Sequence, residues 1–415
     1  MSGHSRPTAT TPRITDPGDP GRLISAEVVR HIVGCYAGAL RAVVLTGSLA
    51  RSEGTIAVDG GRSLVLGDAE FLVVLADRAQ LPTSAATQAI AGTIHADLRE
   101  LGVVCPITLS PVHAAYLRAL RPAVFAYELR SCGRVVWGDP DVLRLIPDFA
   151  AADIPTEDAW RLLCNRLIEQ LELVPDLDRS TVGASKQGLY RTVKLYLDMA
   201  TSLLVFAGSY EPTYRGRSQR LMELAGRAGR SEAYPFHLEH FAEIVALCTR
   251  WKLDGGTGPV PEGMSWYSAV ERGRRLWRWE LAHMAQASVA LSDHELLATL
   301  LDRQSVGERA RGWLHVLRKH GWHRSWRLWP RWARLARRGS PRYLIYAAAC
   351  QTLFEQLDDR LPGPGAQARD AAREAAWANL PVVRPSARAA TTRPWADLVA
   401  EISWNYREFL VDTRA

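Results

Sequence analysis

The chain has 415 residues, of which 47% are hydrophobic and 23% charged, as is typical of soluble globular proteins. This length exceeds what one hydrophobic core usually organises, so two or three domains are expected. The apolar runs are shorter than the ~20 residues of a transmembrane helix. Residues 1–22 lack the apolar centre of a signal peptide and are expected to be a disordered tail. Six scattered cysteines without a Cys-x-x-Cys pair argue against a zinc site or a disulfide framework, and favour a cytoplasmic protein.

The positive charge is concentrated in one segment. The sequence carries 51 Lys and Arg against 44 Asp and Glu, a net charge of +7. Residues 309–342 contain eleven Lys or Arg and no Asp or Glu, so the remainder of the chain is net negative. The basic isoelectric point therefore describes this segment and not the protein as a whole.

The first 150 residues alternate between predicted helices and strands. Apolar residues at helical spacing predict a first helix over residues 25–40. Apolar runs and turn residues then predict, in chain order, a strand over 42–46, a short helix beginning near Ser48, a hairpin tip at Asp59-Gly60-Gly61, a strand over 71–75, a helix over 84–101, and strands over 103–109 and 133–138. This alternation predicts an α/β domain, a mixed sheet with helices, over residues 23–150.

From Pro155 onward the apolar spacing is helical. Glu157 and Asp158 follow Thr156, a combination typical of the first turn of a helix. Helices are predicted over 156–171, 185–207, 213–228, 236–252 and 266–291. Because residues 254–263 are rich in Gly and Pro, they predict a linker between two helical domains, 151–253 and 264–415.

Two short motifs carry the candidate chemistry. Thr46-Gly47-Ser48 closes a strand and opens a helix, where glycine permits close approach of a ligand and the free N–H groups of a helix start attract phosphate oxygens. Asp68 and Glu70 stand two residues apart at the entry to the next strand, so both carboxylates point to one face of the sheet. Carboxylates beside a phosphate-binding turn suit Mg²⁺, which commonly shares its ligands with substrate phosphates.

With its motifs in this order, the chain resembles the DNA polymerase beta-like nucleotidyltransferase superfamily. The resemblance covers residues 25–150, and the helical region to about residue 250 is similar to helical domains appended to such enzymes. It implies that Gly47 and Ser48 hold the β- and γ-phosphates of a nucleoside triphosphate (NTP). It also implies that Asp68 and Glu70 are the catalytic ligands of Mg²⁺ or Mn²⁺. The motifs that carry it are 45–54 (LTGSLARSEG) and 67–74 (GDAEFLVV).

One departure from the superfamily pattern affects catalysis. The third carboxylate of the superfamily stands on the next strand and helps to deprotonate the acceptor hydroxyl. Residues 101–127 contain no Asp or Glu, and Thr108 or Pro106 occupies the expected place. The sequence therefore supports nucleotide binding better than catalysis, with His113 or Glu128 as alternative bases.

Two basic residues are further candidates for nucleotide binding. Arg51 lies one turn after Gly47, where it contacts phosphate or pairs with Glu53 or Asp68. Lys194 is one of only four lysines among 51 basic residues, and a basic residue of the helical domain reaches the triphosphate in many nucleotidyltransferases. The alternative for Lys194 is a surface pair with Asp198 at i+4.

Three functional hypotheses follow. The first is an enzyme, a nucleotidyltransferase that moves a nucleoside monophosphate from an NTP to a hydroxyl of a small molecule, sugar or protein. The second is a catalytically silent nucleotide-binding or regulatory protein, because the third carboxylate is missing. The third is an RNA-binding or RNA-modifying nucleotidyltransferase that uses the basic segment.

The basic, Trp-rich segment 309–342 allows three interpretations. Trp322, Trp326 and Trp329 are spaced as on one helical face, and Pro330 is expected to kink or end that helix. The tryptophans then pack against other helices, or lie in an anionic membrane surface that places the protein peripherally at a membrane, or stack on nucleic acid bases.

Overall fold

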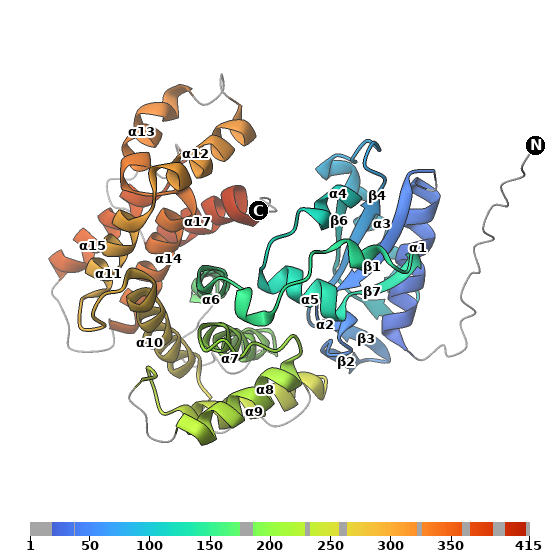
Figure 1. Ribbon diagram of the computed structural model, residues 1–415, viewed down its shortest axis with the longest axis horizontal. Coiled ribbons are helices and arrows are strands. Elements are labelled where there is room, and N and C mark those ends of the chain that lie inside the picture. Colours follow the sequence, from blue (N-terminus) through green and yellow to red (C-terminus); the bar gives the residue numbers. More distant parts are fainter. Residues whose placement is uncertain are drawn as a thin grey trace, which may run out of the picture. The chain divides into compact units, whose positions relative to one another are not determined.

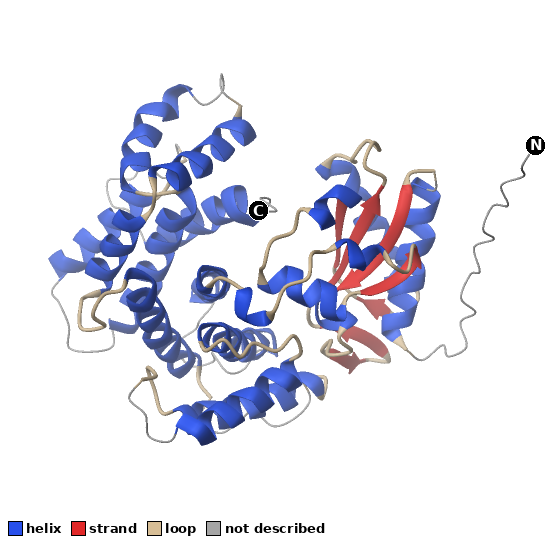
Figure 2. Cartoon of the chain, in the orientation of Figure 1, coloured by secondary structure: helices blue, strands red, loops and turns tan. Residues whose placement is uncertain are grey.

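The computed structural model describes residues 19–36, 38–174, 186–228, 233–256, 264–321, 326–358, 366–384 and 395–411. They form two compact units, one of Met1–Arg121 with Phe125–Asp148 and one of Pro122–Val124 with Phe149–Ala415. The first unit combines a mixed sheet with helices, and the second is mostly helical (Figures 1 and 2). The ranges 151–253 and 264–415, which the sequence predicts as separate domains, fall within the one helical unit.

The central sheet of the first unit has four strands in the order β6-β4-β1-β7. Strand β4 pairs in parallel with β6 and antiparallel with β1, and β1 pairs antiparallel with β7. Each of the four apolar runs therefore becomes one strand of this sheet, although the third begins later than predicted. The strands are β1 (Leu40–Thr46), β4 (Ala69–Leu75), β6 (Ile107–His113) and β7 (Arg134–Gly138).

Helices α1 (Pro20–Tyr36) and α3 (Ser84–Glu100) pack on one face of this sheet. Val28 of α1 and Leu98 of α3 share a buried cluster with Leu45, Phe71 and Leu109 of the strands. Because side chains alternate along a strand, the residues directly before and after these three in the sequence point to the opposite face of the sheet. The candidate site lies on that opposite face.

Helix α1 begins earlier than predicted. Its first residue is Pro20, inside the range expected to be a disordered tail, and residues 1–18 of that tail lie outside the described residues. Proline suits the first helical position because its missing N–H would have no intrahelical partner there. Asp19 caps the start, since its Oδ1 accepts a hydrogen bond from the Gly21 backbone N–H at 2.9 Å.

A second, smaller sheet is formed mainly by residues between Gly47-Ser48 and Asp68-Glu70. Strands β2 (Ile56–Asp59) and β3 (Arg62–Val65) form an antiparallel hairpin, and β5 (Val103–Val104) pairs in parallel with β3. Gly60 and Gly61 both have positive φ, at 54° and 78°, which confirms the predicted hairpin tip. Three short helices complete the unit and its border: α2 (Gly47–Ala50), α4 (Ala114–Arg118) and α5 (Val124–Cys132).

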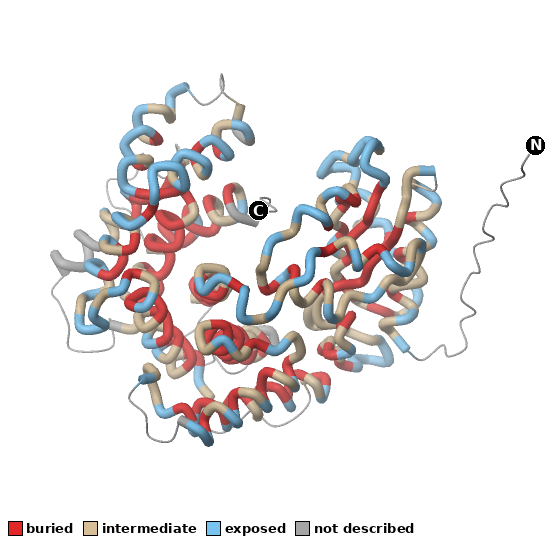
Figure 3. The backbone as a smooth tube through the Cα atoms, in the orientation of Figure 1, coloured by how far each residue is buried: buried red, intermediate tan, exposed pale blue. Residues whose placement is uncertain are grey.

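The second unit buries its core among α6, α7, α10 and α14, which carry large buried side chains such as Trp160, Trp277 and Tyr346 (Figure 3). The helix predicted over 266–291 ends at Ala285, because Gln286 adopts a left-handed conformation. The described helices are α6 (Thr156–Leu173), α7 (Lys186–Phe206), α8 (Tyr214–Ala228), α9 (Leu238–Leu253), α10 (Trp266–Ala285), α11 (Asp293–Arg303), α12 (Val306–His320), α13 (Trp329–Arg338), α14 (Pro341–Asp358), α15 (Ala366–Asn379) and α17 (Trp395–Tyr406). Within the described ranges, no helix combines the length and apolarity needed to cross a membrane.

The basic segment does not form the single helix that the tryptophan spacing suggests. Helix α12 ends at His320, Gly321 follows with a φ of 77°, and α13 begins at Trp329. Pro330 lies in the first turn of α13, so it starts a helix where the sequence predicts that it ends one. Trp322 lies outside the described residues.

Candidate functional site

Four polar side chains gather on the face of the central sheet opposite α1 and α3. Asp68 and Glu70 come from the start of β4, Thr46 from the end of β1 and Thr108 from β6. Glu70 is the register partner of Thr46 on one side and of Thr108 on the other. Thr46, Glu70 and Thr108 therefore form one row across three strands. Asp68 precedes Glu70 by two residues and lies next to this row on the same face.

Hydroxyl groups hold both carboxylates in place. Thr46 Oγ1 donates a hydrogen bond to Glu70 Oε2 at 3.4 Å, and Thr108 Oγ1 donates one to Asp68 Oδ2 at 3.1 Å. Asp68 and Thr108 are exposed, whereas Glu70 is half-buried and Thr46 is buried. The exposed oxygens of Asp68 are thus accessible to a ligand, and Glu70 forms the inner edge of the group.

The turn at Gly47 approaches Glu70 closely. Gly47 has a φ of 67°, in the left-handed region that disfavours residues with a Cβ. A Cβ built at this position would lie 2.5 Å from Glu70 Oε2, closer than any normal contact. Ser48 is half-buried in the same turn. The backbone conformation therefore favours glycine at position 47, and a larger residue there would displace the Glu70 carboxylate.

The helix that follows this turn is shorter than the sequence suggests. Helix α2 spans only Gly47–Ala50, and Ser52 turns the chain away with a φ of 57°. A single turn has almost no macrodipole to attract phosphate. The support for phosphate binding here therefore comes from the open glycine turn and not from a helix terminus.

Arg51 is held by two acidic side chains. Its side chain is only 4% exposed, with Nη1 2.6 Å from Glu128 Oε2 on α5 and Nε 3.5 Å from Glu53 Oε2. The predicted pairing with Glu53 is confirmed. Pairing with Glu128 could not be read from the sequence, because the two residues stand 77 positions apart. This pair also occupies Glu128, one of the two alternative bases.

Thr108, rather than Pro106, stands beside the two carboxylates in the sheet. It is the β6 residue directly opposite Glu70, and its hydroxyl bonds to Asp68. His113, the other alternative base, pairs with Leu75 five residues further along β6, roughly 16 Å away at strand spacing. Its ring Nε2 lies 2.8 Å from the Ala79 carbonyl oxygen. His113 therefore belongs to the opposite end of the sheet.

Lys194 lies on α7 of the second unit and does not pair with Asp198 as expected for a surface lysine. Arg166 Nε donates to Asp198 Oδ2 at 2.5 Å instead. The Lys194 Nζ lies 5.8 Å from the centre of the Tyr190 ring, and Lys252 Nζ lies 5.7 Å from the same centre. Two of the four lysines thus converge on one aromatic ring, a cationic group that remains a candidate anion contact.

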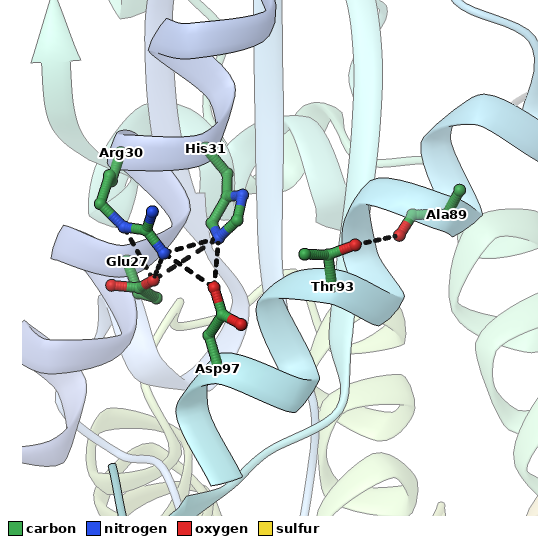
Figure 4. A network of polar contacts seen from close by, with 6 residues as sticks. All are labelled: Glu27, Arg30, His31, Ala89, Thr93 and Asp97. Atoms are coloured by element: carbon green, nitrogen blue, oxygen red, sulfur yellow. Dashed lines mark hydrogen bonds and ion pairs between the residues drawn. The ribbon is translucent and has the colours of Figure 1, made fainter. Parts of the chain in front are cut away.

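A second polar cluster joins the two helices on the other face of the sheet. Glu27 and His31 on α1 and Asp97 on α3 bring three potential ligand atoms within 4.8 Å of one another and could hold a metal ion (Figure 4). His31 Nε2 lies 2.9 Å from Asp97 Oδ2. Arg30 Nη2 contacts Glu27 and lies 2.8 Å from Asp97 Oδ2, so a guanidinium already supplies positive charge there.

This second cluster is best explained as a clamp between α1 and α3. The hydrogen bond from His31 and the neighbouring Arg30 lower the pKa of Asp97, because both favour its charged form. The i,i+4 spacing of Glu27 and His31 is visible in the sequence. Asp97 follows 66 residues after His31, and no local pattern links it to them.

A comparison of the chain with models of known protein families and with curated protein sequences gives no match. The functional argument therefore rests on the residues and their geometry.

Proposed function

We propose that the first unit is a nucleotidyltransferase-type domain that binds an NTP together with Mg²⁺ or Mn²⁺ through Asp68 and Glu70. One observation carries this proposal: two carboxylates share a sheet face beside a glycine turn whose left-handed backbone brings it close to Glu70. Oxygen ligands are those that Mg²⁺ prefers, and an open backbone turn next to them leaves room for phosphate oxygens.

The donor set fits a divalent cation that is shared with a triphosphate. Asp68 is exposed and Glu70 half-buried, so two protein carboxylates leave coordination positions for phosphate oxygens and water. Thr108 orients Asp68 and Thr46 orients Glu70, which reduces the entropy lost when the ligands are fixed. When bound, the cation would neutralise charge on the triphosphate as the leaving group departs.

The proposed reaction is transfer of a nucleoside monophosphate to a hydroxyl group. The acceptor oxygen forms a bond to the α-phosphorus, the bond from that phosphorus to the bridging oxygen breaks, and pyrophosphate leaves. The hydroxyl proton must go to a base. Thr108 cannot accept it at neutral pH, so we expect slow turnover in which solvent, or a basic group elsewhere on the acceptor molecule, takes the proton.

A catalytically silent nucleotide-binding protein is the second candidate, and Thr108 is the observation that favours it. With a hydroxyl in place of a carboxylate, β6 contributes orientation but no negative charge. Nucleotide affinity is then expected without pyrophosphate release.

Calorimetry and a turnover assay would test both candidates. The full chain would be titrated with each NTP in Mg²⁺ and Mn²⁺, as wild type, Asp68→Asn and Glu70→Gln. Glu100→Gln is the matched control, because it removes an exposed carboxylate of the same unit at the end of α3. We expect metal-dependent binding in wild type and control and at least tenfold weaker binding in the two site variants. Equal affinity in all four proteins would refute the site.

Turnover distinguishes the two candidates. Wild type would be incubated with labelled NTP, divalent metal, and protein, RNA or metabolite acceptors, and pyrophosphate would be measured. Pyrophosphate release that is lost in Asp68→Asn supports transfer. Metal-dependent NTP binding without pyrophosphate release with any of the acceptors supports the catalytically silent candidate instead.

A further inference from the structure

The basic segment forms a helical hairpin whose inner side is anchored in the second unit. Trp313 of α12 and Trp332 of α13 are buried, with ring centroids 6.0 Å apart. Trp313 Nε1 donates to the Gly339 carbonyl at 2.9 Å, and Trp332 Nε1 donates to the Pro381 carbonyl at 3.0 Å. These two tryptophans therefore serve packing, and the outer side of the hairpin is left to be explained.

The outer side exposes large apolar side chains. Val306 is 79% exposed, Leu314 44% and Trp326 61%. Val306, Ala310 and Leu314 follow one another at i, i+4 and i+8, so they form an apolar line along one face of α12. Three of the nine large hydrophobic side chains exposed in the described part of the chain fall between residues 306 and 326, which marks this stretch as unusual.

The same hairpin carries six exposed arginines against one exposed acidic residue, Glu308. In Figure 3 much of the backbone of α12 and α13, labelled in Figure 1, has the colour of exposed residues. None of the exposed arginines of the hairpin forms an ion pair with a described carboxylate, whereas Arg166, Arg274 and Arg278 deeper in the unit do. The exposed arginines are Arg311, Arg318, Arg327, Arg334, Arg337 and Arg338.

We propose that this hairpin, residues 306–338, docks on the surface of a lipid bilayer that contains anionic headgroups. Arginines in excess of acidic residues are attracted to negative headgroups, while aliphatic and indole side chains settle at the boundary with the acyl chains. Trp313 and Trp332 are both buried, so α12 and α13 are each anchored in the second unit.

The composition of the outer face favours lipid over nucleic acid. Val306 and Leu314 have no ring that could stack on a base, yet both gain by leaving water at a membrane. The exposed ring of Trp326 has the Arg327 guanidinium 5.3 Å from its centre, so one of its faces is already covered. Only the other face is left for stacking on a base, whereas insertion between headgroups needs neither face free.

Co-sedimentation of the full chain with vesicles tests the proposal. Vesicles of phosphatidylcholine alone would be compared with vesicles that also contain phosphatidylglycerol, at low and high salt. We expect binding to the anionic vesicles only, weaker at high salt. A Leu314→Ser/Trp326→Ser variant should bind at least tenfold more weakly, while Met222→Ser, which alters an exposed apolar residue of α8, should bind like wild type.

The charge contribution is tested in parallel. Arg337→Gln/Arg338→Gln should weaken binding severalfold at low salt, and Arg62→Gln/Arg121→Gln, at exposed arginines of the first unit, should not. Circular dichroism would verify that each variant folds. Absence of binding to anionic vesicles, equal binding by the Leu314→Ser/Trp326→Ser variant and wild type, or a salt-dependent RNA gel shift without vesicle binding would overturn the proposal.

Discussion

Because Glu280 is buried, the stability of the helical unit is expected to depend on pH. It is fully buried on α10, where Ser202 Oγ of α7 donates a hydrogen bond to its Oε1 at 2.6 Å. Its Oε2 has no hydrogen-bond partner among the described residues. Burial raises the pKa of Glu280 from 4.5 to about 8, and the Ser202 hydrogen bond opposes this only in part. At neutral pH the folded protein therefore keeps a neutral carboxyl at this position.

The sign and size of the effect follow from the two pKa values. In the unfolded chain Glu280 ionises near its ordinary pKa of 4.5, while the folded chain stays protonated to about 8. The folded state therefore loses stability as the pH rises from 4.5 to about 8. Below pH 4.5 the carboxyl is protonated in both the folded and the unfolded chain, so this loss is absent there. Each pH unit in this window costs about 1.4 kcal/mol, which amounts to roughly 3 kcal/mol between about pH 5 and about pH 7.5.

The Glu280→Gln variant keeps the shape and removes the titration. Urea unfolding of wild type and variant, followed by far-ultraviolet circular dichroism across this pH range, measures the difference. We expect the variant to gain stability relative to wild type as pH rises, by about 3 kcal/mol over the window. If the difference in unfolding free energy between the variant and wild type stays constant with pH, the reasoning is refuted, because Glu280 would then ionise in the folded chain at its ordinary pKa.

Three other perturbations test the first unit. Gly47→Ala should cost about 1–2 kcal/mol for its left-handed backbone and displace the Glu70 carboxylate, so thermal melting and metal-dependent NTP titration should both show a loss. Asp97→Asn should lower stability at neutral pH and flatten the acid limb of the unfolding curve, because the depressed pKa of Asp97 stabilises the fold above 3.8 and that stabilisation is lost as pH falls. Arg51→Met should cost about 3–5 kcal/mol in urea unfolding, since it removes a buried guanidinium that pairs with Glu128 and with the buried Glu53.

The strands and the face of the carboxylates could be predicted from local sequence. One apolar run ends at Gly47 and the next begins after Asp68. Because Asp68 and Glu70 stand two residues apart, their side chains share one face of the sheet, regardless of which strands lie beside them. The same alternation leaves Thr108 or Pro106 as the neighbour on the next apolar run, and only the pairing of β4 with β6 places Thr108 opposite Glu70. The inference that the two carboxylates share a face needs only the period of a strand.

The remaining contacts depend on pairing between distant segments. Glu128 reaches Arg51 across 77 positions, and Asp97 reaches His31 across 66, so no local pattern reports either contact. In the basic segment, the apolar spacing continues past the end of α12 at His320, and periodicity alone cannot show where one helix stops and another begins. Long-range register is a property of the packed core and is absent from any short window.

Binding and chemistry are therefore separable on this sheet. The alternation that places Phe71 and Leu109 in the core under α1 and α3 is the same alternation that turns Glu70 and Thr108 to the other face. A shift of β6 by one residue would expose Leu109 and bury Thr108, so burial of the core fixes the register of the site. In the proposed function the two carboxylates for a cation come from the start of β4, whereas β6 contributes a hydroxyl in place of a base. The proposal therefore predicts that cation binding is retained with Thr108 in that row and that proton removal from the acceptor is slow.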